Sequence, residues 1–181
     1  NSSAASDVYK RQDLISGDYY FNYTCNDTAG NENTSNTFLS SIDLDAPIIT
    51  VIEPTTNETI GENYTYLNIT ISDEHPENCT VNWNGTITSM LNTSDNFYIN
   101  KTDLSDGVYY FNYTCNDTVG NENTTINYNT DIDTTAPTIT VIEPTSNETL
   151  GVNYTYLNIT MTDLHPDSCT VNWDGSIISM S

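Results

Sequence analysis

Positive charge is almost absent from this chain. The 181 residues contain three lysines and arginines against 25 aspartates and glutamates, which gives a formal net charge of −22. Such a surface cannot neutralise phosphate groups, so it argues against nucleic acid and anionic lipid as partners. It favours solubility at high ionic strength and attraction of divalent cations. An anionic surface that serves solubility alone is the alternative.

Long apolar runs and catalytic groups are also scarce. No stretch approaches the roughly 18 apolar residues of a membrane span, so we expect no membrane insertion within this chain. Two histidines are present, His75 and His165, each followed by proline and without a nucleophile or an arginine to work with it. Because acid–base and nucleophilic catalysis need such partners, we expect no enzymatic activity and no required cofactor.

Two of the three basic residues stand in a segment that we interpret as foreign. Residues 2–12 read SSAASDVYKRQ, which looks like the in-frame translation of a widely used transposase sequencing adaptor. We therefore interpret residues 1–12 as a sequencing scar and expect the chain to be a metagenomic fragment. Lys101 is then the single basic residue of the remaining 169, against 24 acidic residues.

An internal repeat is the strongest feature that is present. Residues 13–91 return at 103–181 with a constant offset of 90, without a gap and with 53 identities in 79 aligned positions. A period of 90 is too long for a helical solenoid repeat and fits an autonomous all-β domain. We expect the C-terminal part of one repeat at residues 13–44, a complete repeat at 45–133 and the N-terminal part of a third repeat at 134–181.

Short apolar runs separated by Asn, Asp, Gly and Pro predict seven strands in the complete repeat and no helix. A protein built from seven short antiparallel strands of this kind folds as a β-sandwich. The expected strands are residues 48–53, 64–72, 79–83, 86–91, 97–100, 108–116 and 124–129.

The four cysteines form two pairs related by the offset of 90, which indicates an oxidising compartment. Alternation turns Cys79 inward at the start of its strand and Cys115 inward near the end of its own. If the two strands are antiparallel neighbours, these ends lie side by side, so we predict a disulfide between Cys79 and Cys115 within one sheet. Cys25 and Cys169 are then left unpaired by truncation. Four free buried thiols are the alternative.

Several segments resemble immunoglobulin-like domains. Residues 105–111, SDGVYYF, resemble the start of strand F in these domains, and Trp83 resembles the tryptophan of strand C. Residues 117–121 and 135–141 resemble segments of the immunoglobulin-like repeats of prokaryotic surface proteins. The resemblance covers residues 13–181 and implies tandem immunoglobulin-like β-sandwiches of about 90 residues each. Many functions share this fold, so the resemblance does not choose among them.

Motifs for asparagine-linked glycosylation are unusually frequent. Asn-x-Ser/Thr occurs 16 times after residue 12, where chance placement of 24 asparagines predicts about 6. We therefore predict an N-glycosylated exported protein. Strands rich in Asn and Thr that spell the motif by composition are the alternative. The candidates are Asn22, Asn26, Asn33, Asn57, Asn63, Asn68, Asn78, Asn84, Asn92, Asn100, Asn112, Asn116, Asn123, Asn147, Asn153 and Asn158.

Acidic residues gather in the segments that share one end of an immunoglobulin-like sandwich. These are the N-terminal linker, the loop between the second and third strands, and the loop between the last two strands. Carboxylates that converge at a domain junction suit Ca²⁺, which takes six to eight oxygen ligands. No ordered calcium-binding motif is present, and a solvated acidic end is the alternative. The candidate ligands are Asp43, Asp45, Asp73, Glu74, Asp117 and Glu122.

The sequence therefore predicts a non-catalytic structural or adhesive stalk segment of a glycosylated, extracellular cell-surface protein of archaeal type. Its expected partners are the neighbouring repeats of the same chain, together with cell-surface proteins or glycans. The alternatives are an accessory immunoglobulin-like region of a secreted hydrolase, and a carbohydrate-binding adhesin module with outward Tyr110 as a candidate aromatic. Near-identical loops at residues 22–33 and 112–123 favour the spacer.

Overall fold

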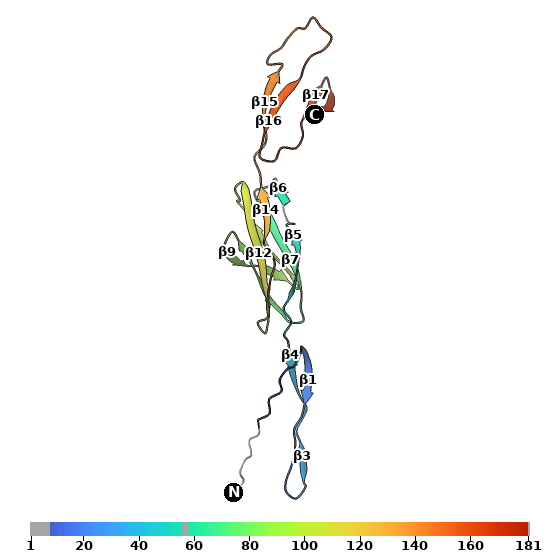
Figure 1. Ribbon diagram of the computed structural model, residues 1–181, viewed down its shortest axis with the longest axis vertical. Coiled ribbons are helices and arrows are strands. Elements are labelled where there is room, and N and C mark those ends of the chain that lie inside the picture. Colours follow the sequence, from blue (N-terminus) through green and yellow to red (C-terminus); the bar gives the residue numbers. More distant parts are fainter. Residues whose placement is uncertain (1–7, 56–57, 181) are drawn as a thin grey trace. The chain divides into compact units, whose positions relative to one another are not determined.

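The computed structural model describes residues 8–55 and 58–180, and these residues form strands and no helix (Figure 1). Asn57, one of the predicted glycosylation sites, lies outside the described residues, as do the first seven residues of the predicted scar. Within the described part of the chain, no helix is long and apolar enough to cross a membrane.

The chain divides into two compact units. One contains the chain up to residue 52 together with residues 68–98 and 111–127, and the other contains residues 53–67, 99–110 and 128 onward. The division runs through the complete repeat, so single strands of that repeat contribute residues to both units.

Ten strands of the described chain build the complete repeat, in two sheets (Figure 1). They are β5 (Ile48–Glu53), β6 (Glu58–Ile60), β7 (Thr65–Ser72), β8 (Pro76–Trp83), β9 (Thr86–Ser89), β10 (Leu91–Thr93), β11 (Asn96–Lys101), β12 (Gly107–Asp117), β13 (Glu122–Thr124) and β14 (Tyr128–Ile132).

The strand order identifies the type of sandwich. The four-stranded sheet has the order β10-β11-β7-β5, and the six-stranded sheet has the order β6-β14-β12-β8-β9, with β13 paired to β12. In immunoglobulin-like domains these are the sheets D-E-B-A and G-F-C with flanking strands. β6 runs parallel to β14, whereas β12 is antiparallel to β8. The expectation of an all-β, immunoglobulin-like sandwich is therefore confirmed.

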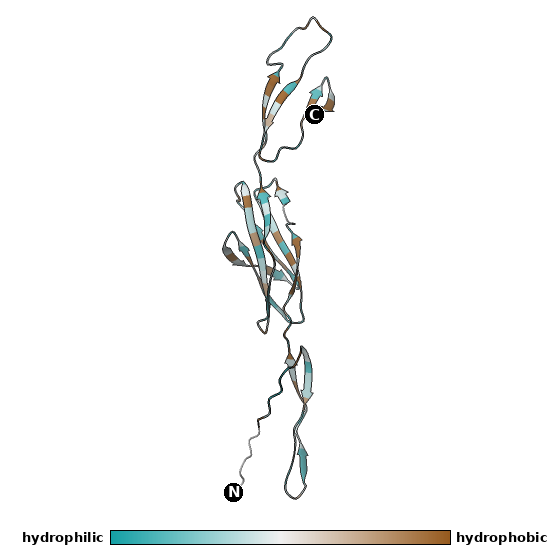
Figure 2. Cartoon of the chain, viewed as in Figure 1, coloured by the Kyte–Doolittle hydropathy of each residue, from teal (hydrophilic) through white to brown (hydrophobic). Residues whose placement is uncertain are grey.

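Alternation of hydrophobic and polar residues builds the core, and Figure 2 shows it as alternating colours along the strands. On β7 the buried residues include Leu67 and Ile69, both fully buried. On β12, Phe111 and Tyr113 are buried, and the rings of Phe111 and Trp83 stack with centroids 5.5 Å apart. Along β7, β8 and β12, every second residue therefore faces the interior.

Cys79 and Cys115 form a disulfide, the pair that alternation predicts. The two residues are directly opposite each other in the register of β8 and β12, with 4.1 Å between their Cα atoms. Both are fully buried. The bond thus joins two strands of the same sheet and leaves Cys25 and Cys169 as the free cysteines of the described chain.

Two predicted strands are split, the predicted strand 79–83 begins earlier, at Pro76, and β6 was not predicted. The predicted strand 86–91 is split into β9 and β10, because its two ends belong to different sheets. The backbone N–H of Met90 donates to the carbonyl of Cys79 in the six-stranded sheet, whereas β10 pairs with β11 in the four-stranded sheet. The predicted strand 124–129 is also split, into β13 and β14. Between them the hydroxyl of Thr125 accepts from the Tyr113 N–H at 3.0 Å, so a side chain replaces a ladder carbonyl there.

The flanking parts contain short antiparallel pairs that copy elements of the complete repeat. Trp173, the copy of buried Trp83, is 49% exposed here. The paired strands are β1 (Gly17–Phe21) with β4 (Phe38–Ile42), β2 (Thr24–Asn26) with β3 (Glu32–Thr34), β15 (Thr138–Glu143) with β16 (Asn158–Thr162), and β17 (Thr170–Trp173) with β18 (Ser176–Ser179).

Candidate functional site at the repeat junctions

Two linkers join the repeats: the first linker, residues 43–47, and the second linker, residues 133–137. The side chain of Asn121, in the loop after β12, contacts the first linker. Its Nδ2 donates to the backbone carbonyls of Asp43 and Asp45, each at 3.2 Å. Nearby, Asn123 Nδ2 donates to the carbonyl of Pro47 at 2.8 Å. Two asparagine side chains therefore hold the linker backbone at three carbonyls.

Asp117 shapes the loop that presents these asparagines. Its carboxylate is fully buried, and Oδ1 accepts from the backbone N–H groups of Val119, Gly120 and Asn121 at 2.7–3.0 Å. Gly120 adopts a φ of 94°, which glycine tolerates without strain. Burial by itself raises the pKa of the Asp117 carboxyl, but the hydrogen bonds from Asn121, Val119 and Gly120 outweigh it, so the pKa lies below its ordinary value.

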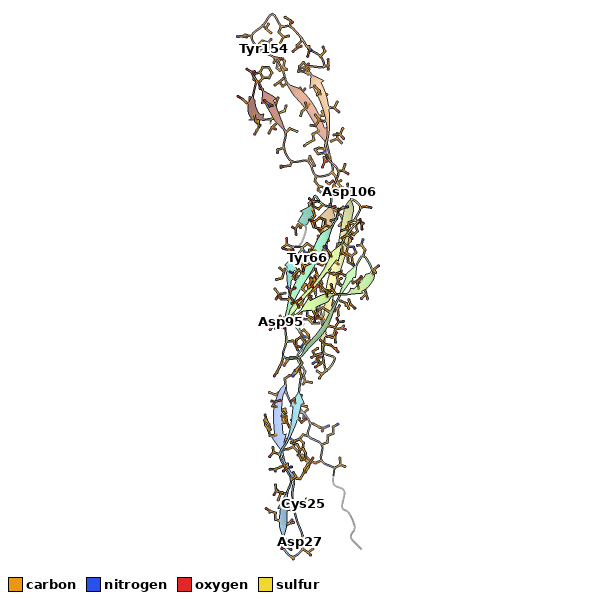
Figure 3. The ribbon with its side chains drawn as sticks, turned by 180° about the vertical axis from the view of Figure 1, so that it is seen from behind. Cys25, Asp27, Tyr66, Asp95, Asp106 and Tyr154 are labelled. Atoms are coloured by element: carbon orange, nitrogen blue, oxygen red, sulfur yellow. A yellow bond between two sulfur atoms is a disulfide. The ribbon has the colours of Figure 1, made fainter. Side chains whose placement is uncertain are left out.

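The first repeat contains the same loop. Asp27 Oδ1 accepts from the N–H groups of Ala29 and Asn31, each at 2.9 Å, and Asn31 Nδ2 donates to Asp27 Oδ2 at 2.7 Å. Asp27 is labelled at this loop in Figure 3. These hydrogen bonds lower the pKa of Asp27, chiefly through the Asn31 side chain. The loop conformation therefore follows from its own sequence and does not need a linker beside it.

His75 holds the first linker from the loop between β7 and β8. Its Nδ1 lies 3.0 Å from Asp43 Oδ2, and its backbone N–H donates to Asp73 Oδ1 at 2.8 Å. The Thr118 N–H donates to the His75 carbonyl at 2.9 Å, which connects this loop to the loop after β12. The hydrogen bond to Asp43 raises the pKa of His75, and the charges of Glu74, Asp43 and Asp73 add to the effect.

His165 repeats this contact at the second linker. Its Nδ1 lies 2.8 Å from Asp133 Oδ2, and its backbone N–H donates to Asp163 Oδ1 at 2.8 Å. Its other nitrogen, Nε2, lies 3.0 Å from Asp131 Oδ2. Residue 41, the position that corresponds to Asp131, is a serine, so the second junction has an additional carboxylate. The pKa of His165 is raised, first by the hydrogen bond to Asp133 and then by the charge of Asp131.

Each linker is also held by the repeat that precedes it. Ser16 Oγ accepts from the Leu44 N–H at 3.0 Å, and at the corresponding position Asp106 Oδ1 accepts from the Thr134 N–H at 2.8 Å. Asp106, labelled in Figure 3, also accepts from the hydroxyls of Thr134 and Thr135. The Thr135 and Thr134 side chains lower the pKa of Asp106. Both linkers therefore have partners on both sides.

The predicted calcium ligands separate into two groups. Asp43, Asp73 and Asp117 converge, with one carboxylate oxygen of each within 4.8 Å of the others. The remaining three, Asp45, Glu74 and Glu122, are exposed and stand outside this group. In the converging group, hydrogen bonds from His75 and from the loop after β12 already occupy several oxygens. A cation at this site would have to share them.

The predicted glycosylation sites differ in exposure. In the flanking parts all six are exposed: Asn22, Asn26, Asn33, Asn147, Asn153 and Asn158. In the complete repeat, the exposed ones are Asn63, Asn84, Asn92, Asn100 and Asn123, and the half-buried ones are Asn68, Asn78, Asn112 and Asn116.

Sequence reasoning missed the residues that hold the linkers. It considered His75 and His165 only as catalytic candidates and Asn123 only as a glycosylation site, and it assigned no linker contact to Asn121, Ser16 or Asp106. One sequence signal was available. Each histidine stands 32 residues after an aspartate of the linker, His75 after Asp43 and His165 after Asp133. No sequence pattern distinguishes the linker contacts of Asn121 from those of any other loop asparagine.

No protein-family model matches the sequence, and no curated protein matches it. Among solved structures, the chain is similar to fibronectin(III)-like modules of Clostridium thermocellum CbhA, at 18% identity over 72% of each chain and a TM-score of 0.47. Half of the chain is similar to an endo-β-1,4-mannanase from Thermotoga petrophila, at 10% identity and a TM-score of 0.42, and it spans only 20% of that enzyme. None of these likenesses assigns a function.

Proposed function

We propose that this chain is a non-catalytic spacer or stalk segment of an extracellular, glycosylated cell-surface protein, in which the adjoining repeats hold each linker in place. The observation that carries the proposal is the recurrence of the linker contacts at an offset of 90 residues. His75 and His165 bind the linkers from the following repeat, and Ser16 and Asp106 bind them from the preceding one.

The free energies involved show why several of these contacts are needed to order the linker. Ordering each linker residue costs about 1–2 kcal/mol of backbone entropy. Each hydrogen bond returns about 0.5–1.5 kcal/mol, and the first linker accepts or donates in bonds with Asn121, Asn123, His75 and Ser16. Pro47, which is fully buried, reduces the entropy cost further because its φ is fixed in the unfolded chain. The entropy cost and the free energy of the hydrogen bonds are of similar size, so the linker stays ordered only while most of the contacts are present.

The remaining parts of the proposal rest on the chemistry of the chain. A buried disulfide supports export to an oxidising compartment. The 16 glycosylation motifs and the excess of acidic residues support an archaeal-type surface protein. The same spacer would serve as the accessory region of a secreted hydrolase if the complete protein carries a catalytic domain.

Limited proteolysis tests the spacer proposal. Leu44 is 62% exposed, so a chymotrypsin-like protease reaches its side chain, and cleavage depends on whether the backbone can leave its bonded conformation. We expect the native chain to resist cleavage after Leu44. The double variant His75→Ala/Asn121→Ala should be cleaved there many times faster. Equal cleavage rates for the two proteins would contradict the proposal.

A carbohydrate-binding adhesin is the second candidate. Tyr110 lies on β12 with a side chain that is 59% exposed, two residues before half-buried Asn112. An exposed aromatic ring beside an amide is suited to stacking on a sugar. Retardation of the chain in a polysaccharide gel, lost in Tyr110→Ala, would favour this role. Migration that is unaffected by the polysaccharide would exclude it for the sugar tested.

A further inference from the structure

We propose that Asn84, Asn92 and Asn100 carry the N-linked glycans of the complete repeat, while Asn112, Asn116 and Asn123 serve the fold. This assignment rests on the glycosylated surface protein proposed above and names the sites. In the transfer, an N-glycosidic bond forms between asparagine Nδ2 and the anomeric carbon of a lipid-linked oligosaccharide. The bond from that carbon to the lipid phosphate breaks, and the phosphate leaves with the electron pair while the amide loses one proton.

Access to a folded acceptor depends on both ends of the motif, the asparagine and the hydroxyl residue two positions later. Nine motifs of the complete repeat lie among the described residues, and three of them expose both ends: Asn84 with Thr86, Asn92 with Ser94, and Asn100 with Thr102. Asn63 is exposed, but its partner Thr65 is only 3% exposed. Asn68 and Asn78 are half-buried together with their threonines. A bulky glycan needs an exposed position, so only three motifs qualify.

The motifs on β12 and β13 use their amides within the fold. Asn112 Nδ2 donates to Asn127 Oδ1 at 3.0 Å. Asn116 Nδ2 donates both to Glu77 Oε2 and to the Asp117 carbonyl, so both of its N–H groups are in use. Asn123 Nδ2 donates to Pro47 in the first linker. A glycan on Asn116 would replace one of two N–H donors, and one on Asn123 would stand against the linker.

The hydroxyl groups of two of these motifs, those of Asn112 and Asn123, are engaged as well. Thr114 Oγ1, which belongs to the motif of Asn112, lies 2.9 Å from Thr124 Oγ1 across the strand pair. Thr125 Oγ1, which belongs to the motif of Asn123, donates to the Ile126 carbonyl at 3.0 Å and accepts from the Tyr113 N–H. An enzyme that reads the hydroxyl would have to break these contacts between strands first. The Thr102 hydroxyl of the Asn100 motif also donates, but to the exposed carboxylate of the next residue, Asp103, at 3.2 Å.

The three accessible motifs lie where the sheets are open. β9 ends the six-stranded sheet and β10 ends the four-stranded sheet among the described strands. Asn84 is in the turn that leads into β9, and Asn92 is on β10. Asn100 is on β11 beyond Tyr98, the last β11 residue that pairs with β10. Open strand edges present unpaired N–H and C=O groups that invite pairing with another chain. Glycans at these positions would cover those edges.

The test uses the folded chain of residues 1–181, a purified archaeal-type oligosaccharyltransferase that accepts Asn-x-Ser/Thr, and its lipid-linked oligosaccharide. Peptide mass spectrometry then reports the occupancy of each site. We expect modification of Asn84, Asn92 and Asn100 and none of Asn112, Asn116 and Asn123. The reduced and unfolded chain is the matched control, and it should accept glycans at all six sites.

Two results would contradict the assignment, and only the second would also contradict the proposed function. In the first, the folded chain carries glycan at Asn116 or Asn123 while Asn92 and Asn100 are bare. This result contradicts the assignment alone. Absence of glycan from both the folded and the unfolded chain contradicts the assignment together with the glycoprotein part of the proposed function.

A second measurement checks the structural role without the enzyme. In the unglycosylated protein, Asn112→Gln/Asn116→Gln/Asn123→Gln should lower the thermal unfolding midpoint of the complete repeat. The control variant Asn92→Gln/Asn100→Gln should leave it unchanged; Asn84 is kept because its φ of 47° disfavours glutamine. Equal effects of the two variants would contradict the division into structural and modified sites.

Discussion

Asn31 and Asn121 occupy the same position in two copies of one loop, yet their contacts differ. Among the described residues, Asn31 bonds only within its own loop, to Asp27, whereas Asn121 bonds to Asp117 and also to two linker carbonyls. The same side chain therefore shapes the loop in both copies and holds a linker in one.

Replacing Asn121 by alanine should destabilise the complete repeat. The substitution removes the bonds to the Asp43 and Asp45 carbonyls and the bond to Asp117, so we expect a loss of about 1–3 kcal/mol in the free energy of unfolding. Chemical denaturation followed by tryptophan fluorescence measures it. Asn31→Ala is the control, which should leave the unfolding of the complete repeat unchanged. A loss below the error of the measurement in Asn121→Ala would show that the linker contacts carry no stability.

The two histidines should titrate above their ordinary pKa of 6.5. Since the pKa is raised in the folded state, their stabilising contribution is fully present below pH 6.5 and is lost as the pH rises through the raised folded values. NMR titration of the imidazole resonances in EDTA reports each pKa. Asp43→Asn should lower the pKa of His75 and leave that of His165 unchanged. Unshifted histidines in the native chain would contradict the junction geometry.

At the scale of strands, the disulfide joins β8 and β12 where they are directly opposite each other. It closes a loop with a sequence separation of 36 residues, which contains β9, β10 and β11. Those three strands include β9 and β10, one edge strand of each sheet, so the bond restricts a segment that contains two edge strands.

Removing the disulfide should therefore weaken the repeat substantially. Cys79→Ala/Cys115→Ala is expected to lower the free energy of unfolding by roughly 2–5 kcal/mol, the range for native disulfides in small secreted domains. Denaturation of both proteins under the same oxidising conditions measures the difference. Treating the double variant with a reductant should have no further effect on its stability. If the native protein and the variant unfold at the same denaturant concentration, the bond does not stabilise the repeat.

The sequence predicted most strands, the fold class and the cysteine pair, because each depends on alternation along a single strand. It did not predict that residues 86–91 cross from one sheet to the other at Met90, since that crossing depends on which sheet each backbone group meets. It also missed the break at Thr125, where a hydroxyl replaces a ladder carbonyl. The candidate site was found only in part, because Asp43, Asp73 and Asp117 meet through loop conformations that the residue types do not determine.

At the scale of the whole molecule, each linker is part of the adjoining repeats. The first linker has partners at Ser16 on one side and at His75, Asn121 and Asn123 on the other. Because the contacts at Asp43 and Leu44 recur at Asp133 and Thr134, the arrangement is a property of the repeat and not of one junction.

Calcium binding at the first junction stays a prediction. Ca²⁺ held by Asp43, Asp73 and Asp117 would stabilise the folded state by about 1.4 kcal/mol at ten times its dissociation constant, and so raise the unfolding midpoint. Thermal unfolding in calcium and then in EDTA measures the effect, and Asp73→Asn should reduce it. Magnesium at the same concentration controls for ionic strength. Superimposed curves in calcium and EDTA would leave this end of the repeat as a solvated acidic surface.

The most direct measurement of the central claim is ¹⁵N relaxation of the linker amides in the intact chain. If the adjoining repeats hold the first linker, Leu44, Asp45 and Ala46 should have order parameters near the value of about 0.85 that is typical of rigid backbone, as in β8 and β12. In Asn121→Ala these values should fall. Order parameters below about 0.6 in the native chain would show a flexible linker and would contradict the spacer account.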